Sequence, residues 1–279
     1  MPYTAEISRS NPTCFLFLID QSSSMLEPFG RQPDKHKADG VADALNRLLQ
    51  NLAIKCAKSE GVRDYFCVGV IGYGGGVASA FEGPLAGKNI VPISAIANNP
   101  LRVDIRSRKV DDGAGGLIEQ SFRSPVWVQP KAGGRTPMCQ ALGLAKQCLE
   151  VFIGQFPACY PPLVCNITDG AATDGDPLPA AQALRQLTTT DGNVLLFNAH
   201  ISANQAPPIE FPSSEAGLPD KFAPLLFRMS SCLPPRLIDA AHGEGYVVTD
   251  ESRGFVFNGD LVSVIRFIDI GTRVAVTLR

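Results

Sequence analysis

The sequence lacks the features that mark membrane-spanning and nucleic-acid-binding proteins. No stretch reaches the roughly 18 uninterrupted apolar residues that a membrane-spanning helix requires. The formal net charge over 279 residues is only -2, so no basic excess indicates a nucleic acid or an anionic membrane surface. Residues 1–11 are polar and include Glu6 and Arg9, which is not the pattern of a secretory signal. We therefore expect neither a membrane nor a nucleic acid as partner.

Catalytic and nucleotide-binding motifs are also missing. There is no Gly-Lys-Ser/Thr phosphate loop, and the glycines at 72–76 follow a predicted strand without opening a helix, which disfavours a dinucleotide site. Only three histidines are present. His36 alone falls in a loop near the candidate site, and we interpret His200 as a core or rim residue at the end of an apolar strand. No serine has a nucleophile-elbow context, so we expect a protein that is not an enzyme.

Cysteines are present, but never as a Cys-x-x-Cys pair. The eight residues are scattered, which disfavours a zinc cluster. Several, such as Cys14 and Cys165, fall inside predicted strands, where cysteine behaves as a small buried hydrophobe. We expect free thiols, a reducing compartment and therefore a cytoplasmic protein.

Strands and helices alternate along the chain. Short apolar runs predict strands at 14–20, 65–73, 163–168, 194–201 and 245–248, with an extra strand at 274–278. Apolar residues at helical spacing predict helices at 38–58, from 136 onward, at 178–187, at 222–229 and at 261–268. A Gly-Gly-Gly turn returns the chain at 77–81 as an antiparallel edge strand. The predicted fold class is α/β: a Rossmann-like, doubly wound, mostly parallel central sheet with one antiparallel edge strand and helices on both faces.

We predict a flexible N-terminal lead-in at 1–12 and a single domain at 13–279. Residues 82–132 form an insertion without a helical pattern, in which 101–110 and 122–128 are expected to pair as a hairpin around a flexible tip. Its basic run of Arg102, Arg106, Arg108 and Lys109 is interpreted as a solvated face. If the hairpin leans over the candidate site, the same residues would favour an acidic partner.

The most informative stretch is the first strand and the three polar residues that follow it. Asp20, Ser22 and Ser24 come directly after the apolar run, at the sheet edge where open α/β folds bind ligands. Alternation in an extended loop points all three side chains the same way. One carboxylate and two hydroxyls are hard oxygen ligands that suit Mg²⁺ or Mn²⁺ and leave a position for another ligand. A capping role is the alternative, but the next predicted helix begins only near Ala38.

This pattern resembles the metal-ion-dependent adhesion site of von Willebrand factor A domains. The loop at 133–138 resembles the Gly-Gly-Thr loop of that family, with Arg135 inserted before Thr136. Asp169-Gly170, after the strand at 163–168, resembles the third metal loop. The order of the three segments matches the family. Arg135 either pairs with a visiting carboxylate or points to solvent, and we favour solvent.

The resemblance implies a role for each site residue. Ser22 and Ser24 would bind the metal through their hydroxyls, and Thr136 would bind directly or through water. Asp20 and Asp169 would act mainly through bridging waters. The open position would accept a Glu or Asp from a protein partner, because an ion with mostly neutral ligands attracts a carboxylate strongly.

Residues 173–176, Thr-Asp-Gly-Asp, resemble a pattern of stand-alone bacterial members of the tellurium-resistance type. A turn followed by a helix cap explains the same residues, and we favour it over a second metal site. The resemblance implies an adaptor in a bacterial stress, defence or signalling system, with a AAA+ ATPase, kinase or phosphatase as partner. Two alternatives stay open: an Mg/Mn-dependent phosphoester hydrolase that uses the same ion, and a scaffold that binds no ion.

Overall fold

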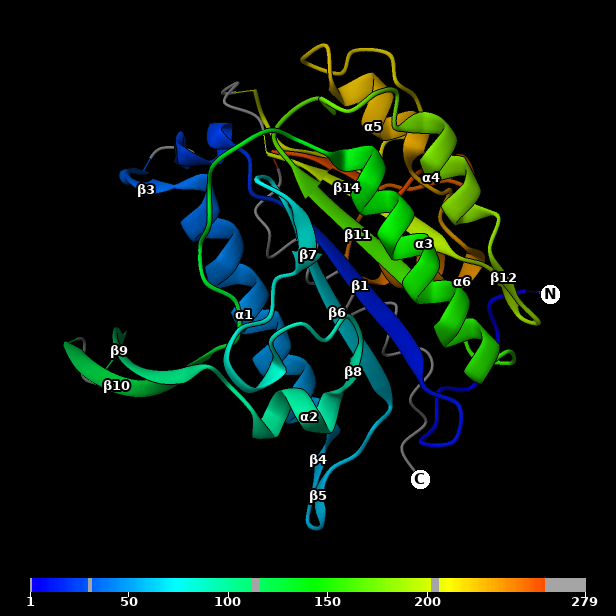
Figure 1. The fold of residues 1–279 in the computed structure, drawn as a ribbon. Coiled ribbons are helices and arrows are strands. Elements are labelled where there is room, and N and C mark those ends of the chain that lie inside the picture. The colour runs from blue at the N-terminus through cyan, green and yellow to red at the C-terminus, as the bar shows by residue number, and fades with distance from the viewer. Residues whose placement is uncertain (1, 30–31, 112–115, 202–205, 259–279) are drawn as a thin grey trace.

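A computed structural model describes residues 2–29, 32–111, 116–201 and 206–258 (Figure 1). The expected helix at 261–268 and strand at 274–278 lie outside these ranges. Within them, the central sheet has eight strands in the order β15-β16-β14-β11-β1-β6-β7, with β8 beside β6. These strands are β1 (Thr13–Asp20), β6 (Phe66–Tyr73), β7 (Val77–Ser79), β8 (Val91–Pro92), β11 (Leu163–Thr168), β14 (Leu195–His200), β15 (Ile209–Glu210) and β16 (Phe255–Phe257).

The sheet is mostly parallel. β1 pairs in parallel with β6 and β11, β11 with β14, and β14 with β16. β7 and β8 run antiparallel to β6 at one edge, and the two-residue β15 runs antiparallel to β16 at the other. The predicted fold class, including its antiparallel edge strand, is confirmed.

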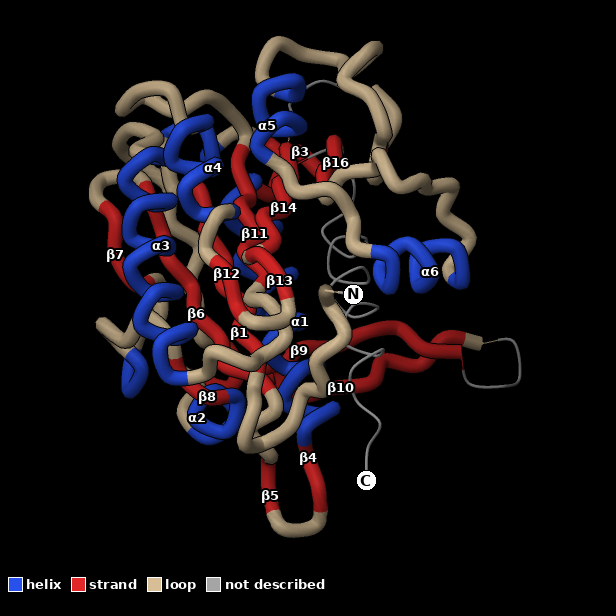
Figure 2. The backbone as a smooth tube through the Cα atoms, turned by 90° about the vertical axis from the view of Figure 1, so that its right-hand side faces the viewer, coloured by secondary structure: helices blue, strands red, loops and turns tan. Residues whose placement is uncertain are grey.

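Strand β1 is buried on both faces, which is why its sequence is continuously apolar. Phe15, Phe17 and Ile19 join one core, while Leu16 and Leu18 join the other. The first core is covered by α1 (Lys37–Cys56), α2 (Ile93–Asn98) and α6 (Pro235–Gly243), and the second by α3 (Met138–Gln155), α4 (Leu178–Arg185) and α5 (Ala223–Met229). Figure 2 shows α4 of one layer and α6 of the other on opposite sides of β11 and β14. The helices thus hold the sheet, and the loops at its edge, from both sides.

The insertion contains the predicted hairpin and a helix that was not predicted. β9 (Arg102–Asp111) and β10 (Leu117–Val126) pair antiparallel and extend away from the body in both views (Figures 1 and 2). The second strand begins five residues earlier than expected, because Leu117 and Ile118 are exposed and give no burial pattern. Helix α2 packs through two buried residues, Ile93 and Ile96, a signal too short to stand out as a helical period.

The expected strand at 245–248 is wrong. Val247 is 96% exposed, and the chain there follows α6 as a loop. The last described sheet strand is instead β16, whose three residues are all buried and pair with β14. Helix α3 also differs slightly, because Pro137 is its N-cap rather than part of its first turn.

Shorter elements complete the described chain. They are η1 (Ser23–Leu26), η2 (Gly83–Leu85) and the hairpins of β2 (Pro28–Phe29) with β3 (Gln32–His36), β4 (Ala57–Lys58) with β5 (Gly61–Val62), and β12 (Thr188–Thr189) with β13 (Gly192–Asn193). In the segment expected to be a lead-in, the backbone N–H groups of Thr4 and Ala5 donate to the Asp191 carboxylate at 2.8 and 2.9 Å. Among the described residues, none of the helices has the length and apolar character needed to cross a membrane.

Candidate metal centre

Asp20 ends β1 at the edge of the sheet where the candidate loops meet. Its side chain is buried, and both carboxylate oxygens accept hydrogen bonds. Oδ1 accepts the Ser22 backbone N–H at 2.8 Å, and Oδ2 accepts the Thr168 hydroxyl from the neighbouring strand β11 at 2.7 Å. Burial raises the pKa of the Asp20 carboxyl, the bonds from Ser22 and Thr168 partly oppose this, and the charge of Asp169 adds to the rise.

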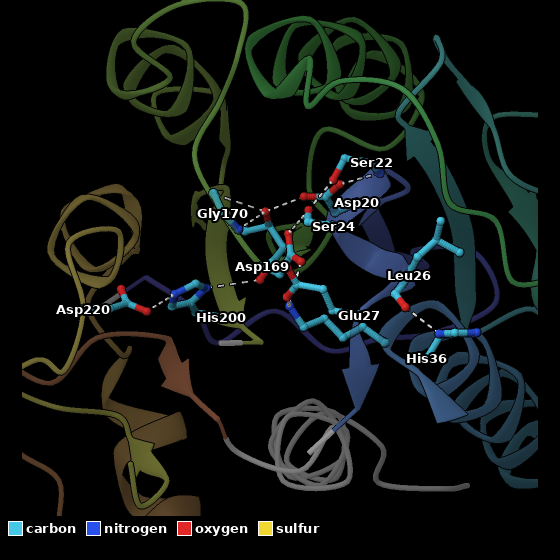
Figure 3. A network of polar contacts seen from close by, with 12 residues as sticks. Asp20, Ser22, Ser24, Leu26, Glu27, His36, Asp169, Gly170, His200 and Asp220 are labelled. Carbon is cyan, nitrogen blue, oxygen red and sulfur yellow. Dashed lines mark hydrogen bonds and ion pairs between the residues drawn. The ribbon is translucent and has the colours of Figure 1, made fainter. Parts of the chain in front are cut away.

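The two serines connect Asp20's loop to Asp169. The Ser22 and Ser24 hydroxyl oxygens lie 3.0 Å apart, and the Ser24 hydroxyl donates to Asp169 Oδ1 at 2.8 Å (Figure 3). Both serines flank the start of η1, which turns the chain immediately after β1. The structure therefore brings Asp20, Ser22, Ser24 and Asp169 into one connected polar cluster. The extended loop expected after Asp20 is not observed, because η1 begins at Ser23.

The loop that carries Thr136 is fastened beside this cluster. Gly133 N–H donates to the Gln21 carbonyl at 2.8 Å, and the Gly134 carbonyl accepts the Ser23 N–H at 3.2 Å. Gly134 has φ +82°, and a Cβ there would lie 2.8 Å from the Gly75 backbone, so only glycine fits this close approach. Thr136 itself is buried, and its N–H donates to the Thr173 hydroxyl at 2.9 Å.

Residues 173–176 form caps for two helices. The Asp174 carboxylate accepts the Cys139 and Gln140 N–H groups at 3.1 and 2.9 Å, at the start of α3. Asp176 Oδ1 accepts the Leu178 N–H at 3.0 Å, at the start of α4. The interpretation as a turn with helix caps is confirmed.

A buried lysine that no sequence pattern marks also lies at the site. Lys37, the first residue of α1, is 2% exposed, and its Nζ lies 2.9 Å from Asp169 Oδ2 and 2.7 Å from Glu27 Oε2. Burial alone would lower the pKa of this amine, but the hydrogen bonds and charges of Glu27 and Asp169 raise it above its usual value. A lysine at a helix start is normally exposed, so no sequence signal marks Lys37 as part of the cluster.

The histidines and Arg135 occupy structural or exposed positions. His200 is buried, with Nε2 2.8 Å from Asp220 Oδ2 and Nδ1 3.3 Å from the Thr168 carbonyl, as a core or rim residue requires. The His36 Nδ1 lies 2.5 Å from the Leu26 carbonyl oxygen. Arg135 is exposed, in agreement with the solvent-facing position that we favour.

The chemistry of the cluster fits a hard divalent cation. Its predicted ligands offer carboxylate and hydroxyl oxygens, which Mg²⁺ and Mn²⁺ prefer, while the Lys37 ammonium already pairs with one oxygen of Asp169. Within the described ranges, no group of three or more His, Cys, Asp or Glu side chains is placed to hold a metal ion. A site rich in carboxylates, imidazoles or thiolates is therefore not found there, and a cation at this edge of the sheet would need the serine and threonine hydroxyls as ligands.

Comparisons with known proteins add little to this geometry. No protein-family model and no curated protein sequence matches the chain. Among solved structures, similarity is found to the vWF domain of the type V pilus tip protein Mfa5 from Porphyromonas gingivalis, with a TM-score of 0.32 and 13% identity over 58% of this chain and 39% of that one. The PilB minor pilin from Streptococcus sanguinis gives a TM-score of 0.46 and 10% identity over 99% of this chain and 63% of that one. The chain thus spans less than two thirds of each neighbour, and its fold class follows from its own sheet topology.

Proposed function

We propose that this chain is a metal-dependent protein-binding module of the von Willebrand factor A type, which captures an acidic residue of a protein partner. One observation carries the proposal: Asp20, Ser22, Ser24 and Asp169 form a connected polar cluster at the carboxyl ends of β1 and β11. That edge of an open α/β sheet is where ligands bind.

Ser22, Ser24 and Thr136 would hold Mg²⁺ or Mn²⁺ through their hydroxyls, with Asp20 and Asp169 in supporting positions. The bound ion would supply an electron-poor centre for an incoming carboxylate. Asp20 keeps the loop in place, because its two oxygens already accept hydrogen bonds from Ser22 and Thr168. Asp169 orients the Ser24 hydroxyl, which donates to it at 2.8 Å.

Binding rather than catalysis is the function that the described residues favour. His200 is buried, and its two ring nitrogens are engaged by Asp220 and by the Thr168 carbonyl, so neither nitrogen is free to act as a general base. We also propose a bacterial adaptor of the cytoplasm, with a AAA+ ATPase, kinase or phosphatase as partner. This second step is supported only by the resemblance of residues 173–176 to tellurium-resistance proteins and by the scattered cysteines.

Thermal unfolding with and without metal tests the proposal. A ligand of the folded state stabilises it by about 2.7 kcal/mol at about 100 times its Kd. We expect Mg²⁺ or Mn²⁺ to raise the Tm of the parent protein relative to EDTA, and to leave the Tm of a Ser22→Ala/Ser24→Ala variant unchanged.

Ser23→Ala is the matched control for this experiment. Ser23 lies on the same turn, but it is exposed and its hydroxyl donates to the Gly134 carbonyl rather than to the cluster. This variant should keep the metal response. An equal Tm in metal and EDTA for the parent would contradict the proposal. Turnover of a phosphate ester that disappears in Asp20→Ala would favour the hydrolase alternative.

A further inference from the structure

The cluster contains a resident ion pair whose two members differ sharply in exposure. The Lys37 side chain is 2% exposed, while the Glu27 side chain, only 2.7 Å from it, is 52% exposed. On the other side of the ammonium, the Asp169 side chain is 1% exposed. Of the two carboxylates that contact this buried cation, Glu27 is therefore the one on the solvent side.

The Glu27 side chain is not needed to close its own loop. The Lys37 N–H donates to the Glu27 carbonyl at 3.0 Å, and the Glu27 N–H donates to the Ser24 carbonyl at 3.0 Å. These backbone bonds hold the start and end of the 27–37 segment together. The side chain can consequently leave Lys37 without opening the loop.

Lys37 cannot follow Glu27 outward in the same way. Its ammonium is also bonded to Asp169 Oδ2, at 2.9 Å, and Asp169 in turn accepts the Ser24 hydroxyl. Lys37 is therefore a positioned cation directly beside the candidate metal residues. Charge-assisted hydrogen bonds of this kind are stronger than neutral ones and favour carboxylate oxygens as acceptors.

We propose that Lys37 is a carboxylate-recognition residue of this site, and that Glu27 occupies it in the free protein and is displaced by the acidic side chain of the partner. Glu27 acts as an internal competitor, so the affinity for the partner is set by the difference between two carboxylates. The proposal rests on the proposed function for the identity of the partner's group. It does not require the metal for the Lys37 contact itself.

The test is an NMR titration with N-acetyl-glutamate N-methylamide, followed through the backbone amides of Ser24 and Gly170. It is run with Mg²⁺ and with EDTA on the parent, Glu27→Gln, Lys37→Met and the double variant. The matched probe is N-acetyl-glutamine N-methylamide, which has the same shape without the charge. Circular dichroism and a Lys37→Arg variant, which keeps a cation, report on folding.

We expect Glu27→Gln to tighten binding by roughly tenfold, and Lys37→Met to weaken it by roughly tenfold, since each change alters about one charge-assisted bond. The double variant should bind as weakly as Lys37→Met, because the competitor matters only when Lys37 is present. The glutamine probe should not discriminate among the variants.

The outcomes separate this proposal from the proposed function. If Glu27→Gln leaves the dissociation constant of the glutamate probe unchanged, the role of Glu27 and Lys37 is overturned. It is also overturned if Glu27→Gln tightens binding equally in the parent and in the Lys37→Met background. If Lys37→Met does not fold, the dissociation constant of Glu27→Gln alone still tests the proposal. Variant effects that are the same in Mg²⁺ and EDTA support Lys37 while contradicting metal dependence. Binding that needs Mg²⁺ but ignores both variants supports the metal and overturns the role of Lys37.

Discussion

A chain of buried polar side chains crosses the sheet from β6 to β14. The Tyr73 hydroxyl donates to Asn166 Oδ1 at 2.7 Å, Asn166 Nδ2 donates to Asn198 Oδ1 at 2.9 Å, and Asn198 Nδ2 donates to the Ser230 hydroxyl at 2.9 Å. All four are buried. Burial raises the pKa of the Tyr73 hydroxyl well above its usual value, so it remains a donor. Such a chain stabilises the fold only while every member has its partner.

Asn166→Ala should therefore be strongly destabilising. It removes the acceptor that lies 2.7 Å from the Tyr73 hydroxyl and the donor to Asn198 Oδ1, at a cost of about 1–3 kcal/mol for each group left unsatisfied. Urea unfolding followed by circular dichroism measures the change. Asn51→Ala, at an exposed position of α1, is the matched control and should shift the free energy of unfolding by less than about 0.5 kcal/mol. Equal midpoints for the two variants would contradict a role for this chain of bonds.

The thiols differ in exposure and therefore in reactivity. Cys232 is exposed, whereas Cys14, Cys56, Cys159 and Cys165 are buried. Burial raises the pKa of Cys56 and of Cys165 to about 12, which suppresses the reactive thiolate. In native protein under reducing conditions, iodoacetamide should modify Cys232 first, and the buried thiols only after unfolding. Mass spectrometry of a time course checks the order, and early labelling of Cys165 would contradict the buried position.

Several site residues were predictable from the sequence because they follow an apolar strand directly. Asp20 ends an apolar strand, and Asp169 matches the third metal loop by resemblance. That the strands before them are neighbours, β1 beside β11, is seen only in the structure. Lys37 and Glu27 were not predictable as a pair, because their contact depends on how the 27–37 loop folds back. The sequence predicts Thr168 only as the last residue of a strand. Its hydrogen bond to Asp20 could not be predicted, because it depends on how β1 is aligned with β11.

At the scale of elements, one carboxylate ties three segments together. Asp43 on α1 binds Lys35 of β3 at 2.8 Å and Arg106 of the β9–β10 hairpin at 3.0 Å. Burial alone would raise the pKa of Asp43, but these two cations lower it below its usual value of 3.8. The hairpin is thereby fastened to α1 through the middle of β9. Two residues of the basic run predicted to be solvated are paired, Arg106 with Asp43 and Arg102 with Asp104.

Asp43 should make the free energy of unfolding depend on pH in the acid range. Because its pKa is lower in the folded protein than in the unfolded chain, its contribution is present above about pH 3.8 and is lost as pH falls through the folded value. Asp43→Asn should therefore lower the free energy of unfolding at pH 7, by about 1 kcal/mol for partly exposed pairs, and much less near pH 2. Urea titrations at the two pH values measure the difference. A variant effect that is equal at both would contradict this role.

Buried strands are easier to predict from this sequence than exposed or very short ones. The buried strands β1 and β11 were predicted within one residue, since burial on both faces leaves a continuous apolar run. The exposed hairpin was found, but its second strand was misplaced, because no buried face sets its register. Strand β16 was missed because only three residues, Phe255–Phe257, carry it.

At the scale of the whole molecule, the two helical layers hold the candidate loops at one edge of a rigid sheet. Strands β1 and β11 are adjacent and parallel, so Asp20 and Asp169 are supported by both cores. A capture site of this kind needs little rearrangement before a partner binds, which lowers the entropic cost of association. We propose that capture of the partner depends on the candidate metal residues Ser22 and Ser24.

The most direct measurement is a pull-down from a lysate of the source organism with the immobilised chain. It runs in Mg²⁺, in EDTA, with the Ser22→Ala/Ser24→Ala variant and with the Ser23→Ala control, and mass spectrometry identifies what is retained. We expect the parent and the Ser23→Ala control to retain a protein in Mg²⁺. The same protein should be lost in EDTA, and the Ser22→Ala/Ser24→Ala variant should not retain it. A partner retained equally under all four conditions would contradict this proposal and would place the interface away from this cluster.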